Sequence, residues 1–76
     1  MKKTTATARA IDFLTEDMFP TLPVRMEING KTYDKKVSDM VDLIKTVEKS
    51  ADKIVVISLL YTYTITANEI SKQANY

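Results

Sequence analysis

The chain has 76 residues, of which 45% are hydrophobic and 28% charged, a composition that predicts one folded domain over residues 1–76 and excludes a disordered chain. Eleven basic and ten acidic side chains leave a net charge of +1, which is not the electrostatic signature of a nucleic-acid-binding protein. The chain contains no cysteine and no histidine, which excludes disulfides, thiolate metal sites and the commonest general base.

The first predicted element is a helix over residues 5–18. Apolar side chains recur there with helical spacing, and the acidic side chains lie elsewhere on the helical wheel. The helix is expected to end before Pro20, because proline disfavours helical geometry in the residue that precedes it. Residues 1–4 are expected to be flexible, and the first ten residues lack the apolar run of a secretory signal.

Residues 24–36 predict a β-hairpin. Asn29-Gly30 is a preferred pair for a type I′ turn, because both central positions of that turn need a positive φ. A two-residue loop at this place makes Ile28 face Lys31 and sets the register of the whole hairpin. Apolar side chains then share one face and polar side chains the other, which predicts one packed and one solvated face.

A second helix is predicted over residues 39–51, with Ser38 as its N-cap and a continuous apolar stripe along one side. Asp39 and Asp42 share a face of this helix and suggest a carboxylate pair that could bind a metal. Solvated acids at a helix N-terminus are the simpler interpretation, because negative charge there is favoured by the helix dipole.

Residues 54–65 are rich in β-branched and aromatic types and predict one long strand. Residues 66–69 read Thr-Ala-Asn-Glu, which has the form of a capping box and predicts a short C-terminal helix. A competing interpretation makes residues 54–75 a single helix. The threonines, the tyrosines and the second cap at Thr66 argue against it.

These elements predict an α+β domain in the order α-β-β-α-β-α. The sheet is expected to be three-stranded and mainly antiparallel, with the helices packed on one face. The helical crossover makes the second and third strands parallel to each other. Placing the third strand beside the first then gives an antiparallel sheet of order 2-1-3.

No arrangement of residues predicts catalysis. We expect no catalytic residue, no cofactor site and no metal site, so the protein is predicted not to be an enzyme. Gly30 is the only glycine, which excludes a glycine-rich phosphate loop. The apolar run at 54–61 is too short to span a bilayer, which needs about 20 residues. A cytoplasmic protein that does not enter a membrane is therefore expected.

The long strand at 54–65 supplies the functional prediction. It would span about 40 Å, whereas each hairpin arm offers roughly 5–6 residues to pair with it. Its unpaired end lacks the lysine, proline or bulge that normally protects an edge. The alternatives are that the N-terminal segment or the last helix covers this end, or that it pairs with a second copy or a target protein.

We therefore expect a small protein–protein interaction module that binds a larger protein, as an inhibitor or adaptor, and that forms a homodimer. Such size and lack of chemistry are typical of phage or mobile-element accessory proteins. The predicted partner contacts are Tyr61, Thr62, Tyr63, Thr64 and Tyr33, because tyrosine is enriched in interface hot spots.

The alternative function is nucleic-acid binding by the basic hairpin. Lys31, Lys35 and Lys36 could contact phosphates while Tyr33 stacks on a base. Acidic residues interrupt this patch, and the balanced total charge supplies no general attraction. We therefore expect nucleic acid not to be the main partner.

Overall fold

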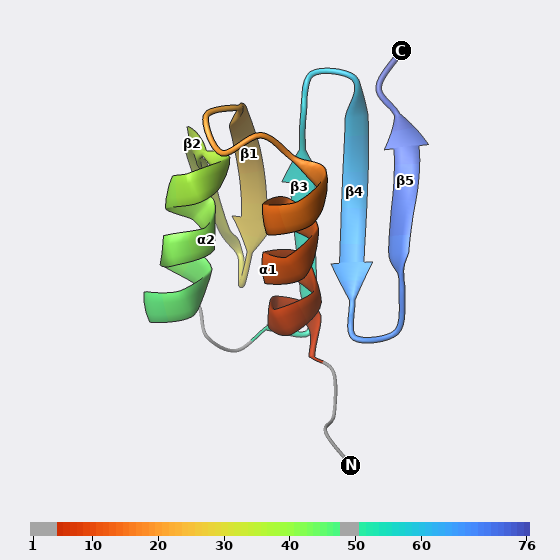
Figure 1. The fold of residues 1–76 in the computed structure, drawn as a ribbon. Coiled ribbons are helices and arrows are strands. Elements are labelled where there is room, and N and C mark those ends of the chain that lie inside the picture. The colour runs from red at the N-terminus through yellow and green to blue at the C-terminus, as the bar shows by residue number, and fades with distance from the viewer. Residues whose placement is uncertain (1–4, 48–50) are drawn as a thin grey trace.

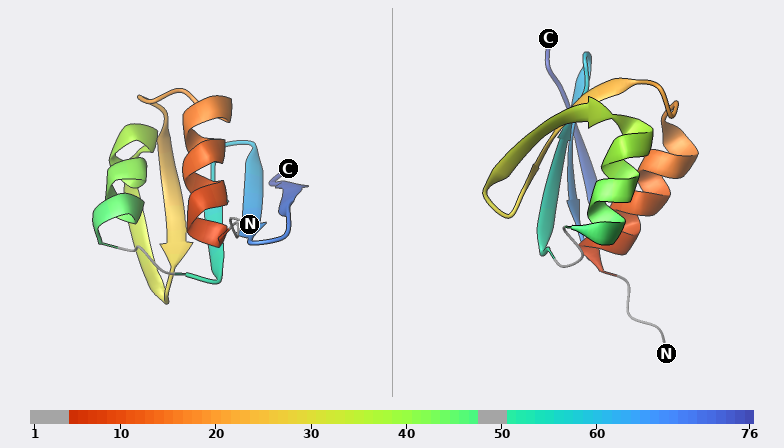
Figure 2. Two further views of the ribbon diagram at one scale, coloured as in Figure 1. Left: turned by 60° about the horizontal axis from the view of Figure 1, so that its bottom comes forward. Right: turned by 90° about the vertical axis from the view of Figure 1, so that its left-hand side faces the viewer.

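The computed structural model describes residues 5–47 and 51–76, which form a layer of helices against a sheet (Figure 1). The elements are α1 (Ala6–Asp17), β1 (Pro23–Ile28), β2 (Lys31–Lys36), α2 (Val37–Thr46), β3 (Lys53–Ile57), β4 (Tyr61–Thr66) and β5 (Ile70–Ala74). The strands form one antiparallel sheet of order β2-β1-β3-β4-β5. Both helices lie on the same side of this sheet, which we call the helix face; the other side is the open face (Figure 2).

The predicted hairpin is confirmed. β1 and β2 pair with Ile28 opposite Lys31, and the turn residues Asn29 and Gly30 have φ values of 52° and 78°. β1 lies between β2 and β3, so the predicted order 2-1-3 is also present within the larger sheet. The Asn29-Gly30 turn therefore determined the register between β1 and β2.

Replacing Gly30 by alanine is expected to lower the free energy of unfolding by about 1–2 kcal/mol. A Cβ atom at Gly30 would meet nothing within 4 Å, so the loss comes from the positive φ alone. Chemical denaturation measures this loss. Lys31→Ala, at the neighbouring exposed position, is the control, and a Gly30→Ala variant as stable as the parent would contradict the left-handed turn.

The first helix begins and ends close to where the sequence places it. Thr5 is the N-cap, and its hydroxyl accepts a hydrogen bond from the Ala8 N–H at 3.1 Å. The helix ends at Asp17, because Met18 is already extended. Ala6, Ala10 and Leu14 are buried along one side and bring α1 down onto the sheet.

The second helix begins and ends earlier than the predicted range 39–51, and Ser38 is not its N-cap. The cap position is Lys36, which makes no side-chain capping bond. Instead, the N–H groups of Val37 and Ser38 donate to the carbonyls of Leu22 and Pro20 at 2.9 and 3.0 Å. The loop before β1 thus satisfies the start of α2, and a local sequence pattern cannot reveal a contact of that kind.

The core lies between the helices and the helix face of the sheet. Leu14, Met40 and Ile44 supply the helical side, and each is at most 1% exposed. The sheet side is formed by alternate residues of the strands, all of them buried: Val24, Met26, Ile28, Ile54, Val56 and Ile65.

The prediction of one long strand over residues 54–65 is wrong, and so is the three-stranded sheet. The chain reverses after Ile57, and the Ser58 N–H donates to the Tyr61 carbonyl at 2.9 Å. Leu59 and Leu60 form the two-residue loop between Ser58 and Tyr61, and neither leucine has a positive φ. The Ser58 hydroxyl supports the turn by donating to the Tyr61 carbonyl at 2.8 Å and accepting from its N–H at 3.2 Å.

The predicted C-terminal helix is also wrong, although the hydrogen bond that suggested it is present. The Thr66 hydroxyl accepts from the N–H groups of Asn68 and Glu69 at 3.3 and 3.2 Å. The Glu69 carboxylate, however, accepts from the Ser71 hydroxyl at 3.2 Å, and the chain continues as β5. The order is therefore α-β-β-α-β-β-β, with a five-stranded sheet.

Candidate functional site

The two helices do not cover the whole sheet. α2 contacts β1 and β2, α1 contacts β3 and β4, and neither of these described helices contacts β5 (Figure 1). A helix is about 10 Å wide and strands lie about 4.8 Å apart, so two helices cover roughly four strands. The helix face of β5 and the adjoining edge of β4 consequently lie outside the helical layer.

Four rings, which we call the aromatic cluster, gather at this uncovered part of the sheet: Phe13, Tyr61, Tyr63 and Tyr76. The Phe13 ring on α1 lies 4.7 Å from that of Tyr63 on β4, measured between centroids. Tyr61 lies 6.2 Å from Tyr63 and 6.1 Å from Tyr76. The cluster thus runs from the partly buried Tyr63 to Tyr76, which is 84% exposed.

Two cations lie on the same side of the sheet. The Lys72 ammonium sits 4.1 Å from the centroid of the Tyr61 ring, in a cation–π contact. Arg9 on α1 donates from Nη2 to the Ala67 carbonyl at 2.9 Å, while its buried Nε has no hydrogen-bond partner among the described residues. Within residues 5–47 and 51–76, neither Lys72 nor Arg9 forms an ion pair.

Tyr76 is tied to the cluster by a hydrogen bond between its hydroxyl and that of Tyr61, at 3.3 Å. This hydrogen bond favours the neutral phenol of Tyr76, and slight desolvation adds to the effect, so the pKa of Tyr76 is raised above its ordinary value. The hydrogen bond between the two hydroxyls therefore stabilises the fold fully at pH values below the ordinary tyrosine pKa of about 10. This stabilisation is lost as the pH rises through the raised pKa of Tyr76 in the folded state.

Tyr61→Phe is therefore expected to lower the pKa of Tyr76 towards its ordinary value, because the hydroxyl that bonds to Tyr76 is removed. Phenolate absorbance during an alkaline titration, or NMR of ring-labelled tyrosine, measures the change. Tyr33→Phe is the control, because Tyr33 lies on β2 at the other end of the sheet. An unaltered Tyr76 titration in Tyr61→Phe would show that the two hydroxyls are not bonded in solution.

The structure separates the predicted partner contacts. Tyr61 and Tyr63 lie together on the helix face of β4, but Thr62 and Thr64 alternate with them and lie on the open face. Tyr33 is on β2, with β1 and β3 between it and β4. Only the two β4 tyrosines therefore belong to one surface.

The strand end that was expected to be unpaired is occupied. Thr62 pairs with Gln73 and Thr64 with Ser71, so their backbones face β5. The basis on which a homodimer was predicted is therefore wrong. Self-association itself stays a prediction.

Sequence reasoning missed Phe13, Lys72 and Tyr76 as members of this surface. The last segment offered only a weak signal, because Ile70 and Ala74 lie on one face of a strand but Lys72 stands between them. The capping-box pattern at residues 66–69 concealed it, because it assigned the same segment to a helix.

Comparison with protein-family models, with curated proteins and with solved structures finds no match to this chain. In the described part of the chain, no group of three or more acidic, histidine or cysteine side chains could hold a metal ion. No helix in that part is both long and apolar enough to cross a membrane.

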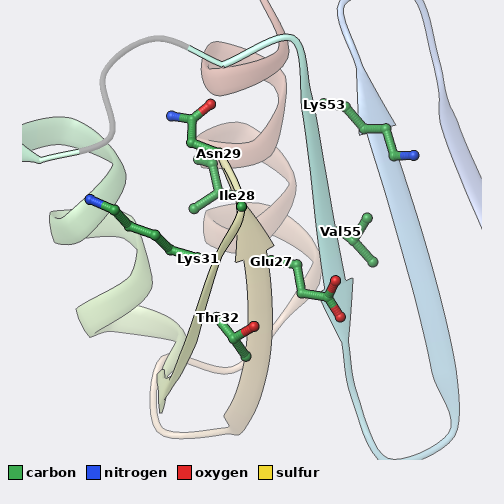
Figure 3. Close-up of a pocket in the computed structure, with 8 residues that line it drawn as sticks. Glu27, Ile28, Asn29, Lys31, Thr32, Lys53 and Val55 are labelled. Carbon is green, nitrogen blue, oxygen red and sulfur yellow. The ribbon is translucent and has the colours of Figure 1, made fainter.

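The basic residues of the hairpin do not converge. Lys31 lies beside the Asn29-Gly30 turn, whereas Lys35 and Lys36 lie at the opposite end of β2. Near the turn, a shallow depression of about 270 Å³ runs from β2 to β3. Figure 3 shows that the Lys31 side chain points away from Lys53, so the two ammonium groups do not form one site.

A second, wider depression of about 690 Å³ includes Lys35 and Lys36 in its wall. It also contains the ion pair between Arg25 Nε and Asp34 at 2.8 Å, in which both side chains are more than half exposed. Asp34 therefore offsets part of the positive charge at this end of the hairpin. A phosphate backbone would meet mixed charges along β2.

We accordingly expect nucleic-acid binding at physiological salt to be weaker than about 10 µM, near the nonspecific range. Fluorescence anisotropy with single- and double-stranded probes measures it. Submicromolar binding that weakens steeply with salt, and that disappears when Lys31, Lys35 and Lys36 are changed to glutamate, would favour the basic hairpin as the site.

Proposed function

We propose that this chain is a protein-binding module that acts by occupying the surface of a larger protein, as an inhibitor or adaptor. The observation that carries the proposal is the aromatic cluster beside β5, at the part of the sheet that the described helices leave uncovered. Tyr61 and Tyr76 are the members best placed to contact a partner, since Tyr61 is partly exposed and Tyr76 is almost fully so.

Physical chemistry supports this use of the cluster. Tyrosine is enriched at interface hot spots, because its ring buries a large area while few torsions are immobilised. Tyr63 packs against Phe13 and the core, so it gives the exposed rings a rigid base. Ring contacts between Tyr61 and its neighbours restrict its orientation before binding, which reduces the entropy lost on association.

A photo-crosslinking amino acid at position 76 tests the proposal in extracts of the native host. We expect one predominant cross-linked protein, identified by mass spectrometry. The matched control carries the same amino acid at Asp42, an exposed position on α2 away from β5.

The captured protein is then titrated against purified variants. Tyr61→Ala and Tyr76→Ala are expected to weaken binding by about tenfold or more, whereas Lys45→Ala on α2 leaves it unchanged. The proposal fails if both positions cross-link the same proteins equally, or if neither tyrosine affects the affinity.

A further inference from the structure

The outer edge of β5 presents backbone groups that the described structure does not use. β5 is the last strand of the sheet and pairs only with β4 within the described residues. At its two ends, Thr66 N–H donates to the Glu69 carbonyl and Asn75 N–H to the Leu60 carbonyl, both at 2.9 Å. Facing and outward residues alternate along an antiparallel strand. The odd-numbered residues therefore face β4, and Ile70, Lys72 and Ala74 direct their N–H and C=O groups outward.

We propose that β5 accepts an additional strand from the partner, an extended segment with a carboxylate opposite Lys72. This inference rests on the proposed function and specifies its mode of binding. The incoming backbone bonds to Ile70, Lys72 and Ala74, while its side chains on the helix face lie beside the aromatic cluster. The sequence expected in the partner is therefore apolar, any, acidic, any, apolar.

The two edges of the sheet differ in their protection. β2 carries Lys31, Lys35 and Lys36, and lysines are a common device against edge pairing. β5 carries only Lys72, and its ammonium is folded over the Tyr61 ring. β5 contains neither proline nor a bulge in its pairing with β4. It is therefore the edge that is open to strand addition.

Charge argues for a foreign strand rather than a second copy. If two β5 strands paired antiparallel so that Ile70, Lys72 and Ala74 of both copies were all hydrogen-bonded, Lys72 of one copy would lie directly opposite Lys72 of the other. Like charges at such a position are destabilising. Sliding one copy along the other separates the lysines but leaves outward groups unpaired.

A carboxylate meets complementary charge at the same place. Lys72 has no ion-pair partner among the described residues, and its ammonium lies over the Tyr61 ring. The nearest acidic residue along the chain, Glu69, is bonded to the Ser71 hydroxyl. A partner carboxylate can therefore pair with Lys72 without displacing an existing ion pair.

A random heptapeptide library displayed on phage, selected against the folded chain, tests the inference. We expect enrichment of peptides with an acidic residue flanked by alternating apolar residues. In the NMR spectrum of the labelled chain, a selected peptide should slow amide exchange at Ile70, Lys72 and Ala74 at least tenfold. Exchange at Ser71 and Gln73, which face β4, should change much less.

Two sets of variants separate backbone pairing from side-chain contact. Ala74→Pro removes an outward N–H and leaves the bonds to β4 in place, so peptide affinity should fall at least tenfold. Lys72→Glu should lower affinity for the acidic peptide and raise it for a lysine-centred peptide, with Lys45→Glu as the control. The Ala74→Pro variant could unfold, so two N-methylated peptides give the same test, one methylated at the odd positions and one at the even positions. Only one set of peptide N–H groups faces β5, so one peptide should lose binding and the other should keep it.

Three results would overturn strand addition. The first is selection of peptides with helical spacing. The second is a peptide whose binding is unchanged by N-methylation at either the odd or the even positions but is abolished by Tyr61→Ala. That result would exclude strand addition and leave the proposed function standing. The third is protection of the same amides in the free chain as its concentration rises, which would make a second copy the occupant. An absence of any selected peptide would also count against it, whereas failure of the cross-linking experiment would count against the proposed function.

Discussion

Replacing Ile65 by alanine is expected to lower the free energy of unfolding by about 2–5 kcal/mol. Ile65 is fully buried on β4, between Ile54 on β3 and Ile70 on β5. A domain of this length is stable by roughly 4–11 kcal/mol in total, so the variant loses a large share of that stability. Chemical denaturation at a concentration where the protein is monomeric measures the change.

Thr64→Ala is the matched control for this experiment. Thr64 is the preceding residue on the same strand, but its side chain lies on the open face and is only partly buried. We expect a loss below about 1 kcal/mol for this variant. Equal losses at Ile65 and Thr64 would contradict the assignment of the two faces of β4.

Replacing Tyr63 by alanine is expected to cost about 2–4 kcal/mol of folding stability, because the ring packs on Phe13 and on the edge of the core. Tyr61→Ala should cost less, because Tyr61 contacts Tyr63 and the exposed Tyr76 rather than the fully buried residues. Denaturation of the two variants under identical conditions gives the comparison.

A double-mutant cycle between Phe13→Ala and Tyr63→Ala isolates the ring contact. Paired aromatic rings contribute about 0.5–1.5 kcal/mol beyond the area that they bury. A coupling energy near zero would show that α1 does not hold Tyr63. A larger loss of stability at Tyr61 than at Tyr63 would reverse the roles that we assign to them.

Features that depend on neighbouring residues were predictable. The Asn29-Gly30 pair needs a positive φ at both positions, so it set the hairpin and its register without reference to the rest of the chain. The first helix followed from its apolar spacing and from Pro20 shortly after its end. The helical connection between β2 and β3 made these two strands parallel, and placing β3 beside β1 then gave the order of the first three strands.

Features that depend on distant contacts were not predictable. The Leu59-Leu60 loop contains no glycine, asparagine or proline, so the apolar run through it gave no sign of a reversal. The Thr66 hydroxyl accepts from the Glu69 N–H, as in a capping box, but the Thr66 N–H donates to the Glu69 backbone carbonyl rather than to its carboxylate, and a strand follows.

The sequence by itself therefore determined the α+β class, the hairpin and the first helix, because a turn or a helical period is specified by residues within a few positions. The tertiary structure decided whether residues 66–76 became helix or strand. As β5, Ile70 pairs beside the buried Ile65, and the chain satisfies the backbone of β4. The same pairing moved the open edge from β4 to β5 and brought Tyr76 and Lys72 to Tyr61, because residues distant in the sequence become neighbours only once the sheet has formed.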